Sequence, residues 1–478
     1  MIGKTLSEIQ SLISKGKLSV SALAEHYLNN IEKTKHLNIY TEIFREDLLE
    51  AAGRLDAKIR SGVENPGRLF GCIISVKDLI CIKDKKISAG SGILPDFVSK
   101  YNAHLIQTLL DEDALFIGST NCDEFGMGSA TVNCVHGAVR NALDPDKIAG
   151  GSSGGAAVSV QADTCLVALG TDTGGSVRQP ASMCGVSGYK PTYGIVSRSG
   201  LIAYASSFDQ VGIISRHVED MDRIMEVISC IDHADATMYR HSLYPQQQFG
   251  IEEKKDGNYK IAYFTETLNA GKNNPAIEHA FQNTIDKFEL AGHTVSGVQF
   301  KWLDYLVPCY YILTTAEASS NLSRYDGVRY GYRTPAATNL RNMYVRSRTE
   351  GFGKEVKKRI MLGTFVLSEA YYDAYYSQAQ RVRRLISNYM EQLFESFDFL
   401  IMPATPHTAW RVDEQPADPL QVYFADVYTV LANLSGTPAI SVPAGTDGEN
   451  MPFGMQVYAG RLMDKKLLKF ASEIDILA

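Results

Sequence analysis

The stretch Cys165-Leu-Val-Ala-Leu-Gly-Thr-Asp-Thr-Gly-Gly-Ser176 is an apolar run that leads into a glycine-rich loop ending on a serine. The apolar residues predict a short buried strand, and the glycines allow tight turns and a close approach of the backbone to a ligand. Such a loop also leaves successive backbone N–H groups free to bind a developing oxyanion. We therefore expect this strand end to take part in attack on a carbonyl group.

A second serine loop and a lysine lie upstream of this stretch. The loop is Gly150-Gly-Ser-Ser-Gly-Gly155, and Lys77 follows the apolar run 72–76. A lysine near two hydroxyls can act as the base that a histidine supplies in other hydrolases. Burial at a strand end would lower the pKa of Lys77 and favour the neutral amine that a base requires. The alternative interpretation of Lys77 is an ordinary salt-bridged lysine, with Asp78 as its partner.

Three other kinds of site fit these loops less well. A phosphate-binding loop of the Walker type needs Gly-Lys-Ser/Thr at its end, but two alanines follow Gly155, and no Rossmann Gly-x-Gly-x-x-Gly is present. A Ser-His-Asp triad needs a histidine within reach, and the nearest in sequence, His136 and His217, belong to no motif. Ser176 also lacks the Gly-x-Ser-x-Gly elbow. Lys77 is therefore the preferred base.

The order of apolar runs predicts an α/β protein. Between residues 70 and 216, which we expect to form the catalytic core, short strands alternate with helices. This pattern is typical of a central sheet with helices on both faces. We expect one mixed, mostly parallel sheet within a single domain over residues 1–478. Strands are predicted at 72–76, 115–118, 165–169, 260–264, 294–298, 399–402 and 439–442. Helices are predicted at 105–112, 156–162, 275–290 and 465–474, and the stretch 351–397 is expected to be rich in helix.

Two segments outside this core are expected to have no part in the chemistry. Residues 1–65 predict three covering helices, and the first begins with a capping box from Thr5 to Glu8. Residues 231–256 are polar and irregular, with a proline and a run of glutamines. This composition predicts a variable excursion at the surface.

The composition is that of an ordinary globular protein, with 45% hydrophobic and 21% charged residues. A net charge of −7 argues against non-specific nucleic-acid binding by this chain alone. A local basic patch is still compatible with this charge. The sequence has no apolar run long enough for a membrane helix and no secretory signal. None of the eight cysteines forms a Cys-x-x-Cys pair. We therefore expect a cytoplasmic protein with reduced, partly buried thiols and no membrane contact.

Three consecutive motifs in the core resemble the amidase signature family. They are the loop 150–155, the run Gly170-Thr-Asp-Thr-Gly-Gly-Ser-Val-Arg-Gln-Pro180 and the run Cys184-Gly-Val-Ser-Gly-Tyr-Lys-Pro-Thr-Tyr-Gly194. The resemblance extends over essentially the whole chain from Thr5 onward and implies the amidase-signature fold. It also implies hydrolysis of an amide by a Ser-cisSer-Lys triad. In that triad Ser176 would be the nucleophile, Ser152 the bridging serine after a cis peptide bond, and Lys77 the base.

The same resemblance implies roles for the residues around the nucleophile. The backbone N–H groups of Thr173, Gly174 and Gly175, together with that of the nucleophile, would form the oxyanion hole. Asp172 and Arg178 flank the loop on its two sides. We interpret these two residues as an ion pair that stiffens the loop.

Four segments outside the shared core are similar to one subfamily, the A subunits of glutamyl-tRNA(Gln) amidotransferases. They are residues 120–129, 200–210, 316–331 and 351–365. The resemblance to this subfamily implies that Met127, Tyr310, Arg359 and Asp426 hold free glutamine. The chemistry agrees, because an arginine suits a carboxylate and an aspartate suits an ammonium group.

The subfamily resemblance implies a glutaminase that works within a larger complex. The chain would hydrolyse glutamine to glutamate and ammonia. A partner, the B subunit, would use the ammonia with ATP and magnesium to convert Glu-tRNA(Gln) to Gln-tRNA(Gln), and a small C subunit would complete a heterotrimer. The tRNA would be bound mainly by the partner, and no metal or other cofactor is expected in this chain.

Two alternatives stay open from the sequence. One is a stand-alone amidase that acts on small amides, and the expected pair of glutamine-binding residues, Arg359 and Asp426, argues against it. The other is a non-catalytic scaffold of the tRNA complex, and the intact triad argues against that.

Overall fold

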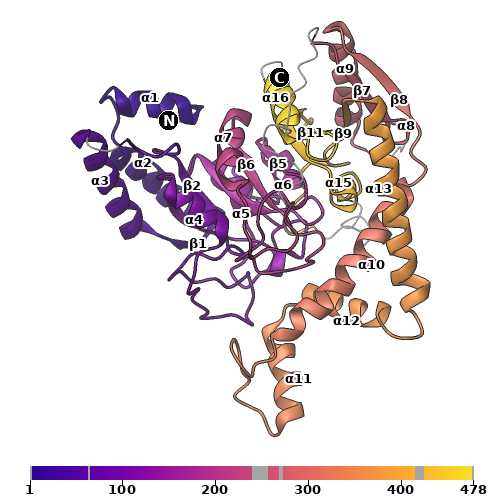
Figure 1. Ribbon diagram of the computed structural model, residues 1–478. Helices are drawn as coiled ribbons and strands as arrows, with labels where there is room; N and C mark the ends of the chain where they lie inside the picture. Colours follow the sequence, from indigo (N-terminus) through magenta and orange to yellow (C-terminus); the bar gives the residue numbers. More distant parts are fainter. Residues whose placement is uncertain (1–2, 63–64, 240–256, 269–272, 415–424, 476–478) are drawn as a thin grey trace.

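An eleven-stranded mixed sheet forms the centre of the molecule (Figure 1). The computed structural model describes residues 3–62, 65–239, 257–268, 273–414 and 425–475, and the statements below refer to this part of the chain. The strand order is β1-β3-β2-β4-β6-β5-β10-β11-β9-β7-β8. The strands are β1 (Tyr40–Ile43), β2 (Ile73–Lys77), β3 (Leu115–Thr120), β4 (Val167–Thr171), β5 (Ser187–Lys190), β6 (Val211–Ser215), β7 (Lys260–Phe264), β8 (Thr294–Val298), β9 (Phe399–Pro403), β10 (Ala439–Thr446) and β11 (Pro452–Tyr458).

Parallel pairing occurs in two blocks of the sheet. β2 pairs in parallel with β3 and β4, and β7 pairs in parallel with β8 and β9. Helices lie in the connections within each block, as expected where the chain must return to the same edge of the sheet. The strands between the blocks, β6, β5, β10 and β11, pair antiparallel, and β1 adds an antiparallel edge. The mixed α/β sheet predicted from the sequence is confirmed. Among the described strands, four pairings are parallel and six are antiparallel, because the strands that join the two parallel blocks pair antiparallel.

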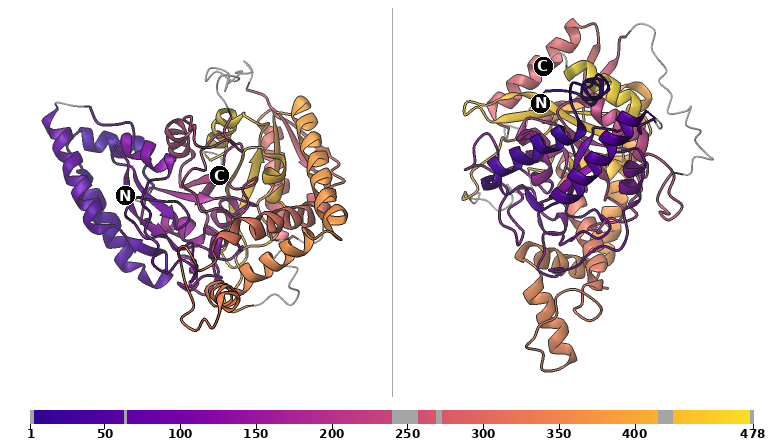
Figure 2. Two further views of the ribbon diagram at one scale, coloured as in Figure 1. Left: turned by 60° about the horizontal axis from the view of Figure 1, so that its bottom comes forward. Right: turned by 90° about the vertical axis from the view of Figure 1, so that its left-hand side faces the viewer.

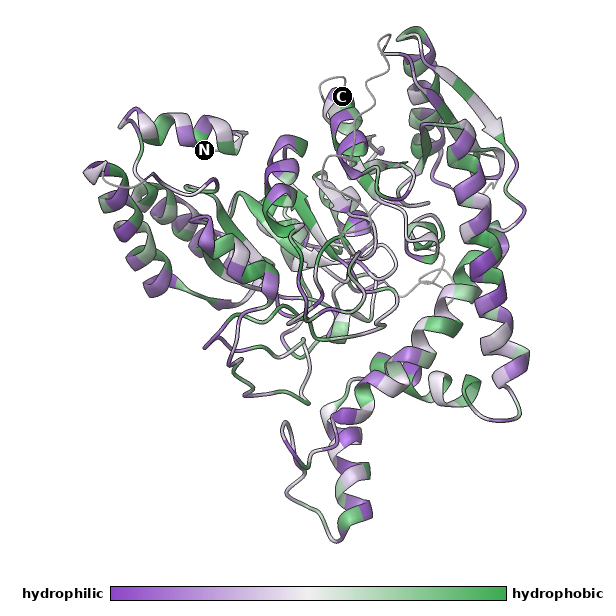
Figure 3. Ribbon diagram, in the orientation of Figure 1, coloured by the Kyte–Doolittle hydropathy of each residue, from purple (hydrophilic) through white to green (hydrophobic). Residues whose placement is uncertain are grey.

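Helices cover both faces of this sheet. Along β9, Phe399 and Ile401 pack into one hydrophobic cluster, whereas Leu400 and Met402 pack into a second cluster. Successive side chains of a strand point to opposite faces, so the two clusters lie on the two sides of the sheet. Residues of α7 (Val218–Ile228), α9 (Pro275–Leu290) and α16 (Asp464–Asp475) complete the first cluster, and residues of α10 (Leu303–Asn321), α12 (Lys354–Val366) and α13 (Gln378–Ser396) complete the second. Figure 3 shows the same division, with apolar central strands and helices that alternate between hydrophilic and hydrophobic residues.

The helices range from single turns to nineteen residues. They are α1 (Leu6–Ser14), α2 (Val20–Lys33), α3 (Arg45–Ser61), α4 (His104–Asp111), α5 (Gly154–Gln161), α6 (Arg178–Cys184), α7 (Val218–Ile228), α8 (Thr265–Leu268), α9 (Pro275–Leu290), α10 (Leu303–Asn321), α11 (Leu340–Gly351), α12 (Lys354–Val366), α13 (Gln378–Ser396), α15 (Val430–Ser435) and α16 (Asp464–Asp475), with a π-helical turn at Tyr372–Ser377.

The N-terminal helices lie at one end of the sheet, as predicted (Figure 1). The expected capping box of α1 is present. Thr5 Oγ1 accepts a hydrogen bond from the Glu8 N–H at 3.3 Å, and the Glu8 carboxylate accepts one from the Thr5 N–H at 3.0 Å. Helix α3 packs on both β3 and α2, so these helices cover the outer edge of the sheet.

Every predicted strand and helix is present, and β7, β8 and α9 coincide with their predicted ranges. Of the predicted excursion 231–256, residues 240–256 lie outside the described part of the chain, and residues 231–239 form turns and bends. In the ranges that the structure describes, no helix is both long and apolar enough to span a membrane. All eight cysteines are free thiols. That the whole chain forms one domain stays a prediction.

Candidate active site

Two neighbouring parallel strands bring the candidate base to the two serine loops. β2 ends at Lys77 and β4 ends at Thr171, and both strands point to the same edge of the sheet. The loop before α5 reaches this edge as well. Lys77 Nζ donates hydrogen bonds to Ser152 Oγ at 2.8 Å, Ser153 Oγ at 2.9 Å and Thr171 Oγ1 at 2.9 Å. The lysine and the first serine loop, which lie 75 residues apart, therefore form one cluster.

Lys77 is fully buried and forms no ion pair with any residue that the structure describes. The alternative partner, Asp78, instead accepts hydrogen bonds from the N–H and hydroxyl of Ser88, so the salt-bridge interpretation is wrong. Burial lowers the pKa of Lys77 to about 8, although nearby acidic groups such as Asp123 and Asp172 oppose the shift. A substantial fraction of Lys77 is therefore neutral near pH 8.

The two serine loops are tied to each other through their backbones. The Gly151–Ser152 peptide bond is cis, as the resemblance implied. The Ser153 N–H donates to the carbonyl oxygen of Ser176 at 3.1 Å. Among the described residues, the hydroxyl of Ser176 has no hydrogen-bond partner, and the residue is 9% exposed. Its hydroxyl is therefore not engaged elsewhere in the described chain, and the backbone of Ser176 is joined to the loop whose serines contact Lys77.

Gln179 links the first serine loop to the neighbouring segment 120–129. Its Oε1 accepts the Gly151 N–H at 2.8 Å, and its Nε2 donates to the carbonyl oxygen of Ser129 at 2.8 Å. The side chain is fully buried. Both ends of the Gln179 amide are thus used to fix the relative position of two loops.

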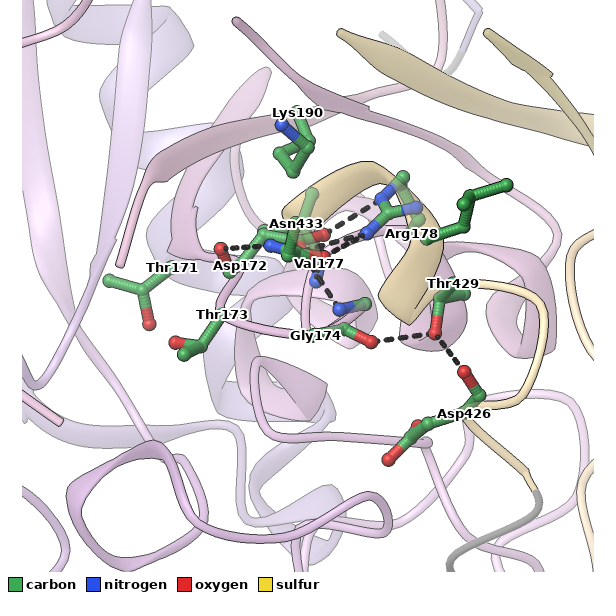
Figure 4. Close-up of polar contacts among 12 residues, drawn as sticks. Thr171, Asp172, Thr173, Gly174, Val177, Arg178, Lys190, Asp426, Thr429 and Asn433 are labelled. Carbon is green, nitrogen blue, oxygen red and sulfur yellow. Dashed lines mark hydrogen bonds and ion pairs between the residues drawn. The ribbon is translucent and has the colours of Figure 1, made fainter. Parts of the chain in front are cut away.

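Asp172 holds the loop that carries Ser176 (Figure 4). Its carboxylate accepts hydrogen bonds from the N–H of Gly175 at 2.8 Å and from Nε and Nη2 of Arg178 at 3.0 and 2.9 Å. Asn433 Nδ2 donates to the same carboxylate at 3.0 Å. Burial alone would raise the pKa of Asp172, but the charge and hydrogen bonds of Arg178 lower it to about 2. The predicted ion pair that stiffens the loop is confirmed.

This arrangement separates the candidate oxyanion donors into two groups. The Gly175 N–H points to Asp172 and is already used in a hydrogen bond. By contrast, the N–H groups of Thr173, Gly174 and Ser176 have no acceptor among the described residues. We expected the Gly175 N–H to bind an oxyanion, but in this conformation it donates to Asp172 instead. The N–H groups of Thr173, Gly174 and Ser176 stay available to bind an oxyanion.

The glycines of this loop allow other parts of the chain to approach it closely. A Cβ atom on Gly174 would lie 2.5 Å from Cζ of Tyr310. Gly175 has a φ of +125°, and a Cβ atom there would overlap the side chain of Thr429. Thr429 Oγ1 also donates to the carbonyl oxygen of Gly174 at 2.6 Å. Tyr310 and Thr429 thus pack directly against the nucleophile loop.

Arg359 is held in a fixed orientation among aromatic rings. Its Nε donates to Glu355 Oε1 at 2.8 Å, and its Nη1 donates to the hydroxyl of Tyr204 at 2.9 Å. Its guanidinium carbon lies 5.2 Å from the ring centroid of Tyr311. The side chain is only 6% exposed, so a carboxylate that reached it would bind in a poorly solvated environment.

Asp426 offers a negative charge in the same region. Its Oδ2 accepts a hydrogen bond from Ser129 Oγ at 2.7 Å, and its carbonyl oxygen accepts the Thr429 N–H at 3.0 Å. Burial raises the pKa of Asp426 to about 7, although the charge of Arg359 acts in the opposite direction. Burial raises the pKa of Tyr310, and the charges of Arg359 and Asp426 act on that pKa in opposite directions. Met127 is fully buried in the same hydrophobic cluster as Tyr310.

The sequence did not single out the side chains that orient these residues. Ser129 orients Asp426, whereas Tyr204 and Glu355 orient Arg359. All three lie within the segments 120–129, 200–210 and 351–365 that carry the subfamily resemblance. Those motifs therefore supply the side chains that hold Arg359 and Asp426 in place. Elsewhere in the described chain, no group of three or more His, Cys, Asp or Glu side chains could hold a metal ion.

The comparison with protein families agrees with this geometry. The family described as Amidase matches residues 22–468. The chain belongs to the amidase family. The resemblance that the core motifs predicted is therefore confirmed.

Two relatives within the amidase family share nearly their whole length with this chain. One is named as the A subunit of the glutamyl-tRNA(Gln) amidotransferase from Chlorobium phaeobacteroides (strain BS1), and it is 44% identical over 96% of this chain and 95% of its own. A protein of the same name from Chlorobaculum parvum is 43% identical over 98% of this chain and 97% of its own. The similarity therefore extends over nearly the whole of each chain.

Solved structures of amidases are similar as well. The crystal structure of the A subunit of the glutamyl-tRNA(Gln) amidotransferase from Thermotoga maritima has a TM-score of 0.78 and 34% identity, covering 98% of this chain and 93% of that one. Another structure, described as an amidase, has a TM-score of 0.82 and 25% identity, covering 99% and 100%. The amidase-signature fold is thus confirmed.

Proposed function

We propose that this amidase is the glutamine-hydrolysing subunit of a glutamyl-tRNA(Gln) amidotransferase. The observation that supports the proposal is that a buried guanidinium, Arg359, and a buried carboxylate, Asp426, are each held by dedicated hydrogen bonds. Both charges act on Tyr310, which packs against Gly174 in the loop of the nucleophile. Free glutamine carries an α-carboxylate and an α-ammonium group, which Arg359 and Asp426 match in charge. A small neutral amide would make no ion pair with either residue, and Arg359 would keep only its pair with Glu355 and Asp426 only its hydrogen bond from Ser129.

The triad would then work as a proton relay. Neutral Lys77 takes a proton from the hydroxyl of Ser152, which takes the proton of Ser176 as that oxygen attacks the amide carbon of glutamine. The tetrahedral oxyanion accepts hydrogen bonds from the free N–H groups of Thr173, Gly174 and Ser176. Loss of one such donor costs about 3–4 kcal/mol in other acyl transfers.

The second half of the reaction releases the products. The relay returns a proton to the leaving nitrogen, and ammonia departs. Water then attacks the γ-glutamyl ester on Ser176, and the relay accepts its proton, which gives glutamate and restores the serine. The hydrogen bond between Lys77 Nζ and Ser152 Oγ supports the first transfer, and the backbone hydrogen bond between Ser153 and Ser176 supports an approach of the nucleophile to Ser152.

The ammonia would be used outside this chain. The relatives' names contain both a subunit designation and a tRNA substrate, which supports a complex in which B and C subunits work with this one as partners. In this proposal the B subunit binds ATP and magnesium and amidates Glu-tRNA(Gln). The complex would be a cytoplasmic heterotrimer.

One assay tests the proposal and separates it from both alternatives. Ammonia release from glutamine is measured for the chain alone, for the complex with its partners, and for the complex with Glu-tRNA and ATP. We expect turnover to be low for the chain alone and highest in the full mixture, since ammonia released without an acceptor is wasted. Equal turnover in all three would favour a stand-alone amidase, and no turnover in any would favour a scaffold.

A further inference from the structure

Positive charge is concentrated in one projecting part of the molecule. Residues 322–354 comprise the loop after α10, the helix α11 and the first residue of α12, and they extend away from the sheet (Figures 1 and 2). We call these residues the basic arm. They include seven Lys and Arg residues but two Asp and Glu residues, whereas the whole chain has a net charge of −7. The arm thus has the opposite charge from the rest of the molecule.

Most of this positive charge is exposed and not neutralised. Two arginines of the arm form ion pairs, Arg329 with Asp326 at 3.5 Å and Arg346 with Glu350 at 2.9 Å. Ion pairs at a solvated surface are weak. Four further exposed cations of the arm form no ion pair with any residue in the described ranges. These are Arg324, Arg333, Arg341 and Lys354.

The arm is held in shape by contacts within it. Arg348 turns inward, and its Nη1 donates to the carbonyl oxygens of Leu322 at 2.8 Å and Tyr325 at 2.9 Å. The Thr334 N–H donates to Ser347 Oγ at 3.0 Å, which fastens the loop to α11. The exposed cations are therefore carried on a preformed surface, and less entropy is lost when they bind a ligand.

Aromatic rings lie among these charges. Tyr330 and Tyr344 are 38% and 37% exposed. Arginines and lysines interspersed with exposed rings are typical of surfaces that bind nucleic acid, where cations contact phosphates and rings pack on bases or sugars. The spacing of the charges along both a loop and a helix suits an extended polyanion better than a single anionic group.

We propose that the basic arm binds the phosphodiester backbone of the tRNA on which the complex acts. The identity of the RNA rests on the proposed function, whereas the preference for a polyanion rests on the arm itself. From the overall negative charge of the chain we expected only weak contact with tRNA. An average over the whole sequence does not reveal the local positive charge of the arm. The arm would add an electrostatic contact to the binding that the partner provides.

A pair of matched variants tests this proposal. Arg324, Arg329 and Arg341 are replaced together by Gln in the assembled complex. The control replaces three exposed lysines by Gln, so that both variants lose the same charge. These are Lys15 and Lys17, in the turn between α1 and α2, and Lys33, at the end of α2. Binding of an unmodified tRNA transcript is measured by fluorescence anisotropy between 50 and 300 mM salt, and thermal melting checks that both variants fold.

We expect the arm variant to bind the transcript at least tenfold more weakly at low salt. The slope of log affinity against log salt should also fall by about 2, since each phosphate contact contributes about 0.7–0.9. The control should bind like the parent. Equal tRNA binding by the arm variant and the parent would overturn the proposal. Loss of partner subunits with unchanged tRNA binding would overturn it too, in favour of an acidic protein surface. A parent complex without glutaminase activity would refute the proposed function but leave this measurement intact.

Discussion

Lys77 Nζ lies 2.8 Å from Ser152 Oγ, in a fully buried position where no carboxylate of the described chain neutralises it. Burial lowers the pKa of this lysine to about 8. Because the base must be neutral, we expect kcat for glutamine hydrolysis to rise with pH through about 8 and to level off above it. The measurement is the pH dependence of ammonia release by the complex. A kcat that is constant from pH 6.5 to 9.5 would contradict the assignment of the base.

Substitution of the same lysine tests the base independently. Lys77→Arg should lower kcat by about 10²–10⁴-fold or more, since an arginine does not release its proton at working pH. Lys190 provides a matched control, because it is also buried but its Nζ donates to the carbonyl oxygen of Pro191 at 2.8 Å. Lys190→Met should change stability but keep the rise of kcat near pH 8. Near-parental activity of Lys77→Arg would show that a neutral amine is not required.

Added ammonia distinguishes the role of the proposed glutamine pocket from the activity of the rest of the complex. Arg359→Ala and Asp426→Asn should each reduce kcat/KM for glutamine by at least 10²-fold, whereas amidation of tRNA with added ammonium salt should stay near the parental rate. Since burial raises the pKa of Asp426 to about 7, kcat/KM of the parent should also fall as the pH drops below 7. Ser129→Ala, which removes one hydrogen bond to Asp426, should have a smaller effect. Failure of ammonia to rescue amidation would mean that both residues have structural roles.

The contact between Gly174 and Tyr310 predicts a strict requirement for glycine. A Cβ atom at Gly174 would lie 2.5 Å from Cζ of Tyr310, so Gly174→Ala must displace either the ring or the loop that carries Ser176. A displacement of about 1 Å at a reacting group costs on the order of 10²-fold in rate. We expect that loss in kcat, with the fold retained in thermal melting. Gly448→Ala is the control, since no atom lies within 4 Å of its Cβ position. A fully active Gly174→Ala would contradict the close packing described here.

The buried ion pair between Asp172 and Arg178 predicts a large effect on stability. Asp172→Asn would leave the guanidinium of Arg178 buried without its carboxylate, which typically costs about 3–5 kcal/mol. The free energy of unfolding is measured by urea denaturation. Glu226→Gln, which removes one partner of the exposed pair with Lys465, should have a much smaller effect. Equal stability of Asp172→Asn and the parent would show that the pair does not hold the loop.

Strand β6, which pairs with β4, is not among the predicted strands. Strands β2, β3 and β4 at the site could be predicted from the sequence because each is a continuous apolar run bounded by turns. Strand β5 could not, because Ser187-Gly-Tyr-Lys190 contains no such run. It is a strand because it pairs with β6 and with β10, whose paired residues Ser441 and Ala439 lie about 250 positions further along the chain. The antiparallel centre of the sheet thus depends on pairing between residues far apart in the sequence, which local sequence patterns do not reveal.

The contacts of the candidate site also differ in whether the sequence predicts them. The motifs indicated Lys77, Ser152 and Ser176 as members of neighbouring loops, because glycine-rich loops at strand ends have recognisable sequences. The hydrogen bonds of Tyr204 to Arg359 and of Ser129 to Asp426 join residues 155 and 297 positions apart. Nothing in their spacing indicates these contacts. The use of the Gly175 N–H by Asp172 is likewise a matter of loop conformation, which sequence alone does not determine.

The most direct test of the account is the site of attachment of a γ-glutamyl group. The complex and its Ser176→Ala variant are treated with an electrophilic analogue of glutamine, such as a diazoketone, and the modified residue is mapped by peptide mass spectrometry. The account predicts one label, on Ser176, that free glutamine prevents and that is absent from Ser176→Ala. A label on Ser152 or Ser153 that persists in the Ser176→Ala variant would contradict it.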